Sequence, residues 1–534
     1  MTDSLRYEAF WRAVSGRRLL AVYDKGVPLA ETRSDSCPGP RSLHAFATAP
    51  AATVCLLAAA LLTSLSGRYG YHRDELYFLV AGGHPDWGYV DQPPLTPLLT
   101  RAFSSVFGDG PAGLRVAGTL ACVMLVLLVT AVARELGGDR RAQTLAAVCA
   151  ATSTFVLAVG HIVTTATYDL VAWSAVSWLF LRLLRSGDAR WWVPVGAAVG
   201  IGVQNKYLVA MLVAALLGGL AIAGPRRLLR SGWLGVGIAV AVLIAWPNLW
   251  WQEQHGWPQL TVAGGIVADD GTENRLLFVP QQLLFLSPLY VPVCVAGLLR
   301  LWRNAEVGWA RAVAWAYPLL CLQVIGAGGK PYYALPLLLV LLAAGCAPAV
   351  QWLAGGTRRL RHGLLAGAVA VTAAMSLAVG LPVLPTSRLE WVVGINPEQG
   401  EQVGWPELAD AVAAGWQRIP EGERATSVVF TQNYGQAGAL VRYGPARRLP
   451  APYSGHMSFA DWGPPPDTAT GRVLLLQQRG TGTGHGTFFR DCHQVTRVDN
   501  GLNVTNEEQG TAILLCTGTT KPWSQLWPHL RHFY

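Results

Sequence analysis

The sequence predicts an α-helical protein that crosses a membrane many times and ends in a smaller α/β module. Of its 534 residues, 52% are hydrophobic and only 14% are charged, and the mean hydropathy is +0.32. A soluble protein of this length would carry about a quarter charged residues. The 21 tryptophans fit a protein with aromatic belts at two membrane interfaces.

About eleven segments are long and apolar enough to be transmembrane helices, because a helix needs roughly 20 apolar residues to span a bilayer. These segments are 45–66, 112–133, 142–160, 165–184, 191–204, 207–224, 232–250, 280–299, 309–327, 331–350 and 363–382. The pair at 191–204 and 207–224 leaves an alternative open. One long tilted helix there would reverse the orientation of everything that follows.

The distribution of arginine favours eleven spans over ten. With eleven spans and a cytoplasmic N-terminus, five loops face the cytoplasm, and each carries three arginines. These are Arg134, Arg140, Arg141, Arg182, Arg185, Arg190, Arg226, Arg227, Arg230, Arg300, Arg303, Arg311, Arg358, Arg359 and Arg361. Positive residues gather on the cytoplasmic side of membrane proteins. The rule therefore places the C-terminus outside, and it explains the net charge of +9 without a nucleic-acid partner.

The composition divides the chain into three parts. Residues 1–44 are polar and rich in arginine, which predicts a cytoplasmic N-terminal tail and not a cleavable signal peptide. Residues 45–382 hold the predicted spans. Residues 383–534 alternate between helical "WPELADAVAAGW" and strand-like "TSVVFTQ" and "GRVLLLQQR". This alternation predicts an α/β module, which the topology places outside the membrane.

Two of the nine cysteines, Cys492 and Cys516, lie in this module and flank a stretch that looks like a β-hairpin. In an oxidising compartment they would form a disulfide; the alternative is two buried thiols.

Each predicted outer turn carries titratable groups close to the membrane surface. Placing an ionisable side chain there costs less free energy than placing it inside an unbroken span. They include Asp74, Glu75 and Asp91 in the first turn, and His161, Tyr168, Asp169, Lys206 and Lys330 in later turns. Transporters bind at the bilayer midplane, so this pattern favours an enzyme whose substrate has a lipid anchor and a charged head. Lysines would hold a phosphate as point charges, and an acid would accept a proton from an attacking hydroxyl.

Each of these residues also has an ordinary structural interpretation. An aspartate in a loop is usually only solvated, and Asp169 would cap the helix that follows it. Lys206 and Lys330 would then reach to the membrane interface as snorkelling side chains. His161 is better explained by a structural role than by a catalytic one.

The chain resembles the GT-C membrane glycosyltransferases, in the bacterial branch related to protein O-mannosyltransferases and the lipid A aminoarabinose transferase. The resemblance covers about residues 45–382. It is carried by the acid pair in the first outer turn, the "DQPPL" stretch, a Tyr-Asp pair after the third span and a late "KPYYALP". Enzymes of this kind transfer a sugar from a polyprenyl phosphate to an acceptor hydroxyl.

The resemblance implies a role for each site residue. Asp74 would be the general base, and Glu75 would support it. Asp91 and Asp169 match acids of the family, and with Tyr168, His161 and Tyr332 they would bind acceptor or sugar. Lys206 matches a lysine that binds the donor phosphate. Lys330, Arg115 and Arg73 would add positive charge there.

The sequence departs from the aminoarabinose branch at two cations. Tyr77 stands where that branch carries an arginine, and Gln92 stands where it carries a lysine. This makes lipid A and aminoarabinose poor candidates for the substrates. No DxD occurs in the first outer loop, so we expect neither a metal nor another cofactor.

The sequence therefore predicts a glycosyltransferase of the bacterial cytoplasmic membrane that uses a polyprenyl-phosphate sugar donor. The acceptor would be a cell-envelope glycan, a lipid or a protein. The alternatives are a transporter or flippase of lipid-linked sugars, and a membrane scaffold that binds a cell-wall polymer.

Overall fold

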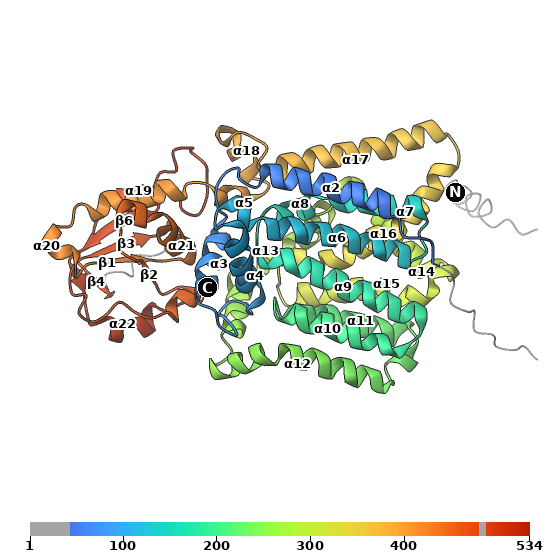
Figure 1. The fold of residues 1–534 in the computed structure, drawn as a ribbon, viewed down its shortest axis with the longest axis horizontal. Coiled ribbons are helices and arrows are strands. Elements are labelled where there is room, and N and C mark those ends of the chain that lie inside the picture. The colour runs from blue at the N-terminus through green and yellow to red at the C-terminus, as the bar shows by residue number, and fades with distance from the viewer. Residues whose placement is uncertain (1–42, 480–486, 534) are drawn as a thin grey trace, which may run out of the picture. The chain divides into compact units, whose positions relative to one another are not determined.

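The structure, a computed structural model, describes residues 43–479 and 487–533. The predicted N-terminal tail, 1–44, lies outside these residues except for its last two. The described chain is helical as far as Gly380 and then mixes helices with strands, as Figure 1 shows.

Helices joined by short turns make up the first part. They are α2 (Thr48–Leu65), α3 (Arg73–Gly83), α4 (Leu95–Phe107), α5 (Pro111–Leu114), α6 (Val116–Glu135), α7 (Arg140–Thr152), α8 (Thr154–His161), α9 (Thr165–Ser186), α10 (Trp192–Val203), α11 (Val209–Ala223), α12 (Gly232–Gln254), α13 (Pro258–Leu284), α14 (Val291–Arg303), α15 (Arg311–Gly326), α16 (Leu335–Ala354) and α17 (Arg358–Gly380).

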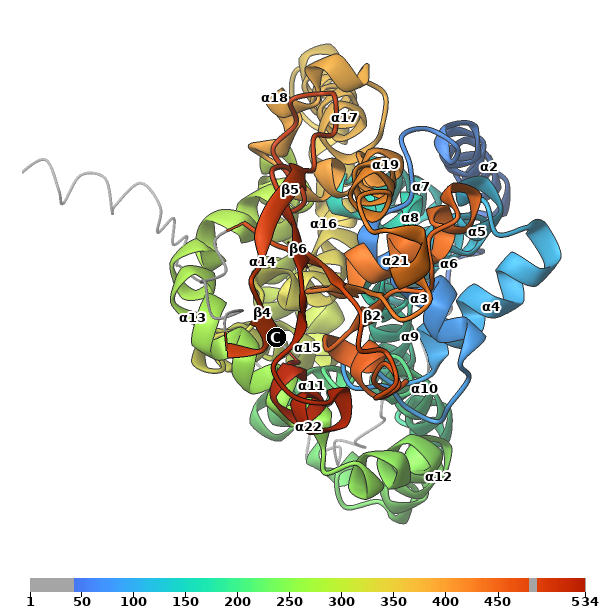
Figure 2. The same cartoon turned by 90° about the vertical axis from the view of Figure 1, so that its left-hand side faces the viewer.

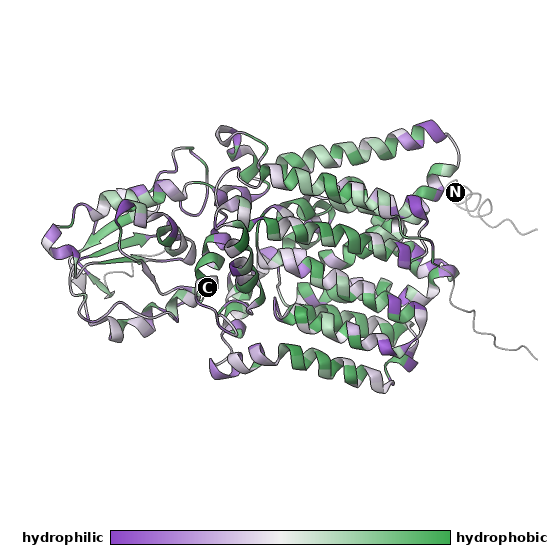
Figure 3. Ribbon diagram, in the orientation of Figure 1, coloured by the Kyte–Doolittle hydropathy of each residue, from purple (hydrophilic) through white to green (hydrophobic). Residues whose placement is uncertain are grey.

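Several of these helices have the length and composition of membrane spans. Among the described residues five helices qualify, or up to seven if each of two bent pairs counts as one span. The five are α2, α5 with α6, α12, α16 with the preceding 3₁₀ turn Pro331–Ala334, and α17. Figure 3 shows hydrophobic residues along the helices and hydrophilic residues gathered near their ends. The protein is thus a polytopic helical membrane protein, and the number of eleven spans stays a prediction.

Helix α16 lies at the centre of the bundle, where 78% of its most apolar window is buried, against 17% for α12 and for α17. It packs against α14 through small residues. A Cβ added at Gly345 would lie 1.8 Å from the Val293 carbonyl oxygen. Only glycine permits this approach of two backbones, which is a common way for helices to associate in lipid.

Two predicted spans are broken. Within 142–160, Ser153 is extended, and α7 and α8 meet at a bend of 60°. Within 280–299, α13 ends at Leu284 and the next helical segment begins at Pro288, with a bend of 69°. Proline disfavours helical geometry in the residue before it, which explains the second break at Ser287.

No span was predicted between residues 250 and 280, but this stretch is helical, because α12 extends to Gln254 and α13 covers Pro258–Leu284. Asp269, Asp270 and Glu273 lie on this helix and not in a loop. Pro258 stands at its first position, where the missing N–H costs nothing.

The C-terminal part contains a five-stranded mixed sheet in the order β2-β1-β3-β6-β5. β1 pairs in parallel with β2 and β3, and β6 pairs antiparallel with β3 and β5. The elements are α18 (Glu390–Val393), α19 (Trp405–Trp416), α20 (Glu421–Arg424), β1 (Val428–Thr431), α21 (Tyr434–Tyr443), β2 (Tyr453–Ser454), β3 (Val473–Gln477), β4 (Phe489–Arg490), β5 (His493–Arg497), β6 (Ala512–Cys516), β7 (Gly518–Thr519) and α22 (Trp523–Leu530).

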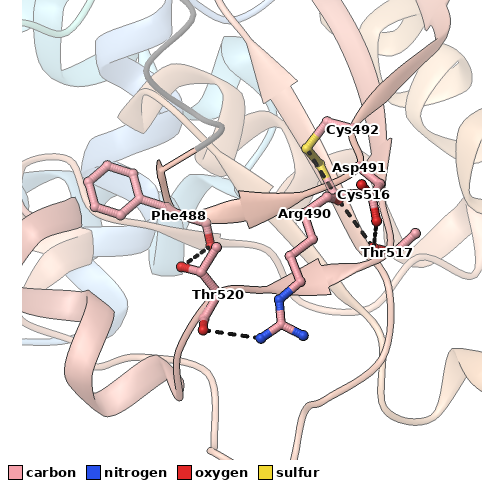
Figure 4. The surroundings of a disulfide bond; sticks show 7 residues. All are labelled: Phe488, Arg490, Asp491, Cys492, Cys516, Thr517 and Thr520. Carbon is pink, nitrogen blue, oxygen red and sulfur yellow. Dashed lines mark hydrogen bonds between the residues drawn. A yellow bond between two sulfur atoms is a disulfide. The ribbon is translucent and has the colours of Figure 1, made fainter.

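A disulfide joins Cys492, just before β5, to Cys516 at the end of β6, as Figure 4 shows. It closes the open end of this antiparallel pair. The short β4–β7 ladder lies next to it, and Arg490 donates through Nη2 to the Thr520 carbonyl oxygen at 3.1 Å.

The C-terminal part packs onto α3 and not only onto itself. Buried Leu76 and Tyr77 of α3 belong to the same apolar cluster as Leu408 of α19, Leu440 of α21 and Leu474 of β3. Figures 1 and 2 both show α21 beside α3. The start of α3 is therefore enclosed by elements from both halves of the chain.

Candidate active site

The acid pair lies in the first turn of α3, which begins with a capping box. The His72 N–H donates to Glu75 Oε2 at 2.8 Å, and the Asp74 N–H donates to His72 Nδ1 at 3.2 Å. This motif fixes the first helical turn, and carboxylates are favoured at a helix N-terminus. The two acids have different surroundings. Glu75 is fully buried, whereas the Asp74 side chain is 28% exposed.

Glu75 pairs with Arg115, which is also fully buried. Arg115 donates through Nε to Glu75 Oε1 at 3.0 Å and through Nη2 to Oε2 at 2.9 Å. Its remaining N–H groups meet the carbonyl oxygens of Ser66 and Gly70, at 2.9 and 2.7 Å. Glu75 Oε1 also accepts from the Val163 N–H at 3.0 Å.

This network revises three predictions. Arg115 makes internal hydrogen bonds with each of its guanidinium nitrogens, so we no longer assign it to the donor phosphate. Glu75 is occupied in the same way and fixes the start of α3 beside Asp74. His161 lies with its Nε2 3.2 Å from Arg115 Nη1 and is buried in the same network.

Asp74 faces the C-terminal module. Its Oδ1 accepts a hydrogen bond of 2.9 Å from the Tyr434 hydroxyl, which comes from the first residue of α21. Tyr434 also packs against the Tyr77 ring, with 5.0 Å between the ring centroids. The contact joins residues 360 positions apart. The sequence offered no signal for Tyr434, because only the folded chain brings α21 to α3.

Two further contacts hold α3 to the same part of the chain. Arg73 forms an ion pair with Glu507 through Nη1, and His72 Nε2 lies 2.8 Å from Glu398 Oε2. Burial alone would raise the pKa of Glu398, but the hydrogen bond and charge of His72, together with the charges of Arg73 and Lys330, hold the pKa at about 2. Arg73, which we predicted as a donor-phosphate ligand, is therefore neutralised by a carboxylate.

Asp91 is subject to the charges of both Asp74 and Lys206. Its Oδ1 accepts a hydrogen bond of 2.6 Å from the Tyr77 hydroxyl. Burial raises the pKa of Asp91 to about 6, while the positive charge of Lys206 opposes this rise and the negative charge of Asp74 adds to it. Tyr77, which stands where the aminoarabinose branch carries an arginine, thus fixes the Asp91 carboxylate by a hydrogen bond.

Lys206 belongs to the turn between α10 and α11. Its Nζ lies 5.1 Å from the centroid of the Tyr333 ring and 5.8 Å from that of Tyr332. The neighbouring Asn205 donates to Asp169 Oδ1 at 2.8 Å. Three predicted site residues therefore come together from separate segments: Asp169 from α9, Lys206 from the α10–α11 turn and Tyr332 from the 3₁₀ turn before α16. Aromatic faces attract such an ammonium group without neutralising it.

Lys330 is the second predicted cation with an unpaired charge. Within 43–479 and 487–533, neither Lys330 nor Lys206 forms an ion pair with a carboxylate. Arg73 and Arg115 both do. Of the four cations predicted to bind phosphate, the two lysines are the ones without an ion pair to a described carboxylate, and Lys206 interacts with Tyr332 and Asp169.

Tyr168 and Gln92 have buried polar groups without partners. The Tyr168 hydroxyl and both side-chain atoms of Gln92 make no hydrogen bond to the described residues. Buried polar groups usually have hydrogen-bond partners, which is consistent with a role for Tyr168 toward a ligand.

The described part of the chain contains no group of three or more His, Cys, Asp or Glu side chains that could hold a metal ion.

His456 forms a hydrogen bond with the backbone of Tyr434. Its Nδ1 accepts from the Tyr434 N–H at 3.3 Å, which requires a neutral imidazole. Burial lowers the pKa of His456 to about 3, and the charges of His532 and Arg73 act in the same direction. An unfolded chain binds this proton at an ordinary histidine pKa of about 6.5. The free energy of unfolding is therefore expected to fall as the pH falls from about 6.5 toward 3.

We expect the melting temperature to be lower at pH 5 than at pH 7, and the His456→Gln variant to lose part of this difference. Thermal unfolding of both proteins in one detergent checks this result. His529→Gln, on exposed α22, is the matched control and is expected to keep the difference of the wild type. An equal pH dependence in His456→Gln and wild type would contradict the assignment.

The family described as dolichyl-phosphate-mannose-protein mannosyltransferase matches residues 91–251. Two undecaprenyl phosphate-alpha-4-amino-4-deoxy-L-arabinose arabinosyl transferases of Pseudomonas fluorescens strains are 25% identical over 292 residues and 28% identical over 292 residues. The matches cover 50% and 51% of this chain and 49% and 52% of those proteins. The chain therefore spans about half the length of the curated relatives it matches.

The fold is also that of a solved structure. ArnT from Cupriavidus metallidurans bound to undecaprenyl phosphate aligns with a TM-score of 0.57, over 87% of this chain and 97% of that one. The apo state of the same protein aligns with a TM-score of 0.54. At 16% and 13% identity these likenesses show a common fold.

Proposed function

Because the chain is related to the GT-C membrane glycosyltransferases, in the group of the protein mannosyltransferases and aminoarabinose transferases, we propose that it transfers one sugar from a polyprenyl phosphate to an acceptor hydroxyl. The reaction takes place at the outer face of the cytoplasmic membrane, with the N-terminus inside and the C-terminal module outside. The Cys492–Cys516 disulfide supports the outer location of that module, because disulfides persist in oxidising compartments.

One observation carries the proposal. The partly exposed carboxylate of Asp74 and the ammonium group of Lys206 both act on the buried Asp91, and neither Lys206 nor Lys330 forms an ion pair with a described carboxylate. The charge of Lys206 acts on Asp91, and that of Lys330 acts on Glu398, which contacts His72. A base and two unmatched cations are the groups needed to activate a hydroxyl and to accept a departing phosphate.

The reaction is a single displacement. The Asp74 carboxylate accepts the proton of the acceptor hydroxyl as its oxygen attacks the anomeric carbon. The bond from that carbon to the phosphate oxygen breaks, and its electron pair leaves with the polyprenyl phosphate. Lys206 and Lys330 stabilise the negative charge that develops on the phosphate. We assign Asp91, Asp169 and Tyr332, which interact with Lys206, to binding of the sugar or the acceptor.

The related proteins described above are transferases by name, which favours a transferase over a flippase. The sugar and the acceptor are not given by this relationship. Tyr77 and Gln92 replace two cations of the aminoarabinose branch, so we propose a donor head other than aminoarabinose.

Replacing Lys206 or Lys330 by glutamine is expected to weaken binding of undecaprenyl phosphate by about tenfold each, since a hydrogen bond to a charged group contributes about 1.5–3 kcal/mol. Native mass spectrometry of the purified protein with undecaprenyl phosphate as the probe measures this loss. Lys521→Gln, in the C-terminal module, is the control and is expected to bind as the wild type. Unchanged binding in both lysine variants would refute the phosphate site.

Tyr434 is a positioning residue for Asp74. Tyr434→Phe removes the hydrogen bond to Oδ1 and keeps the ring that packs on Tyr77. We expect kcat to fall by about tenfold, in line with the loss of one hydrogen bond to a carboxylate, with KM for the donor unchanged. Tyr443→Phe, at the other end of α21, controls for a general effect on the helix. A purely structural role would instead lower the melting temperature and leave kcat per folded protein unchanged.

A further inference from the structure

A second basic site lies at the other end of the helical bundle, away from α3. A cavity of about 740 Å³ opens where α7 begins, α16 ends and α17 begins. Figure 1 shows the starts of α7 and α17 at the same end of the bundle, and Figure 3 shows hydrophilic residues there. Both of the loops that border the cavity are predicted to face the cytoplasm.

The polar part of the cavity is positively charged. Arg140, Arg141, Arg358 and His362 line it, and none of the described residues that line it is acidic. Within the described chain, the guanidinium groups of these three arginines form no ion pair and no hydrogen bond. The nearby carboxylate of Asp139 is used to cap α7, where it accepts from the Ala142 N–H at 2.8 Å.

One helix N-terminus adds to this charge. Arg358 is the first residue of α17, which has no side-chain cap, whereas Asp139 already caps α7. The N-terminal end of a helix carries a partial positive charge and unpaired N–H groups. An anion at the cavity would therefore meet the planar guanidinium groups of the arginines, which match a phosphate in geometry, together with the dipole of α17.

The rest of the cavity is apolar. Leu145, Val148, Val350 and Leu365 line it below the arginines. Helix α17 is little covered by the rest of the bundle, since 17% of its most apolar window is buried, against 78% for α16. The apolar wall thus continues onto a helix that is long and apolar enough to span a membrane.

We propose that this cavity binds a phospholipid with an anionic headgroup from the inner leaflet. The headgroup phosphate meets Arg140, Arg141 and Arg358, and one acyl chain lies along Leu145 and Leu365. The combination of a charged head and an apolar wall favours a lipid over a free anion, and basic pockets between helices on the cytoplasmic side are suited to such lipids. The site is independent of the transfer reaction.

The test compares R140Q/R141Q/R358Q with R226Q/R227Q/R230Q, which removes three arginines from another predicted cytoplasmic loop. Native mass spectrometry of the full chain in detergent gives the affinity for phosphatidylglycerol. We expect the first triple variant to bind about a hundredfold more weakly, at about 1 kcal/mol per arginine, and the second to change by less than about threefold. Equal losses of affinity in the two triple variants would overturn the proposed site, because the lipid would then be attracted by the general positive charge of the cytoplasmic loops.

Further binding experiments distinguish an anionic phospholipid from other ligands of the cavity. Phosphatidylcholine is expected to bind more weakly than phosphatidylglycerol. Leu145→Trp, which fills the apolar part, is expected to weaken phosphatidylglycerol binding without lowering the melting temperature. Displacement of the lipid by equimolar inorganic phosphate would show a site for the free anion, and preferential binding of undecaprenyl phosphate there would show a site for the carrier. Either result would overturn the proposal.

Discussion

Replacing Asp74 by asparagine is expected to lower the rate of sugar transfer by about a thousandfold, because a positioned general base contributes about 10²–10⁴ to a rate. Asparagine keeps the size of the side chain and can still accept from the Tyr434 hydroxyl, but it cannot take the proton of the acceptor. The fold and the binding of undecaprenyl phosphate are expected to remain as in the wild type. The rate is measured as the release of polyprenyl phosphate from the lipid-linked donor.

Asp86→Asn is the matched control for this variant. Asp86 lies in the same outer turn and is exposed, and among the described residues its side chain accepts from the Trp87 N–H at 2.7 Å and from no other group. We expect it to transfer sugar at the rate of the wild type. Full activity in Asp74→Asn, or an equal loss in both variants, would show that Asp74 is not the base.

Replacing Arg115 by methionine is expected to destabilise the protein by about 3–5 kcal/mol, the usual cost of removing one partner from a buried ion pair. Glu75 would then be a buried carboxylate without its guanidinium partner. Methionine has a similar length and fills the space, so a cavity does not explain the loss. The free energy of unfolding, or the melting temperature in one detergent, measures the effect.

A second substitution separates charge from packing. In the double variant Glu75→Gln/Arg115→Met no carboxylate is left unpaired, and about 1–2 kcal/mol of the loss is expected to return. Arg101→Met is the surface control, because Arg101 is exposed and makes one hydrogen bond, to Gly82 at 3.3 Å. It is expected to change stability by less than about 0.5 kcal/mol. No recovery in the double variant would contradict the ion-pair account.

The sequence was informative where local pattern decides structure. Apolar segments of sufficient length became helices because a lipid-facing backbone must satisfy its own hydrogen bonds. In the C-terminal part, β1 and β3 lie in the two runs from which strands were predicted. Helix α13 was missed because its acids, Asp269, Asp270 and Glu273, resemble a loop, although no proline interrupts it between Pro258 and Pro280.

The site was harder to predict, because residue type alone does not tell a buried pair from a reactive group. Glu75 and Arg115 have the residue types of a catalytic site, yet they neutralise each other in the interior. Asp74, one position earlier, points to a different environment because successive helical positions differ by about 100° in direction. Tyr434, Glu398 and Glu507 reach α3 only through tertiary packing, so no local pattern could indicate them.

The most direct test of the transferase proposal asks whether the bond between sugar and phosphate is broken. Purified protein in detergent, where transport across a membrane has no meaning, is incubated with a lipid extract from cells that lack it. Mass spectrometry then follows the polyprenyl-phosphate sugars and the free polyprenyl phosphate. We predict that the wild type releases polyprenyl phosphate and glycosylates an acceptor from the extract, whereas Asp74→Asn does neither. An intact lipid-linked sugar pool with the folded wild type, together with movement of that lipid across vesicles, would contradict the account and favour a flippase.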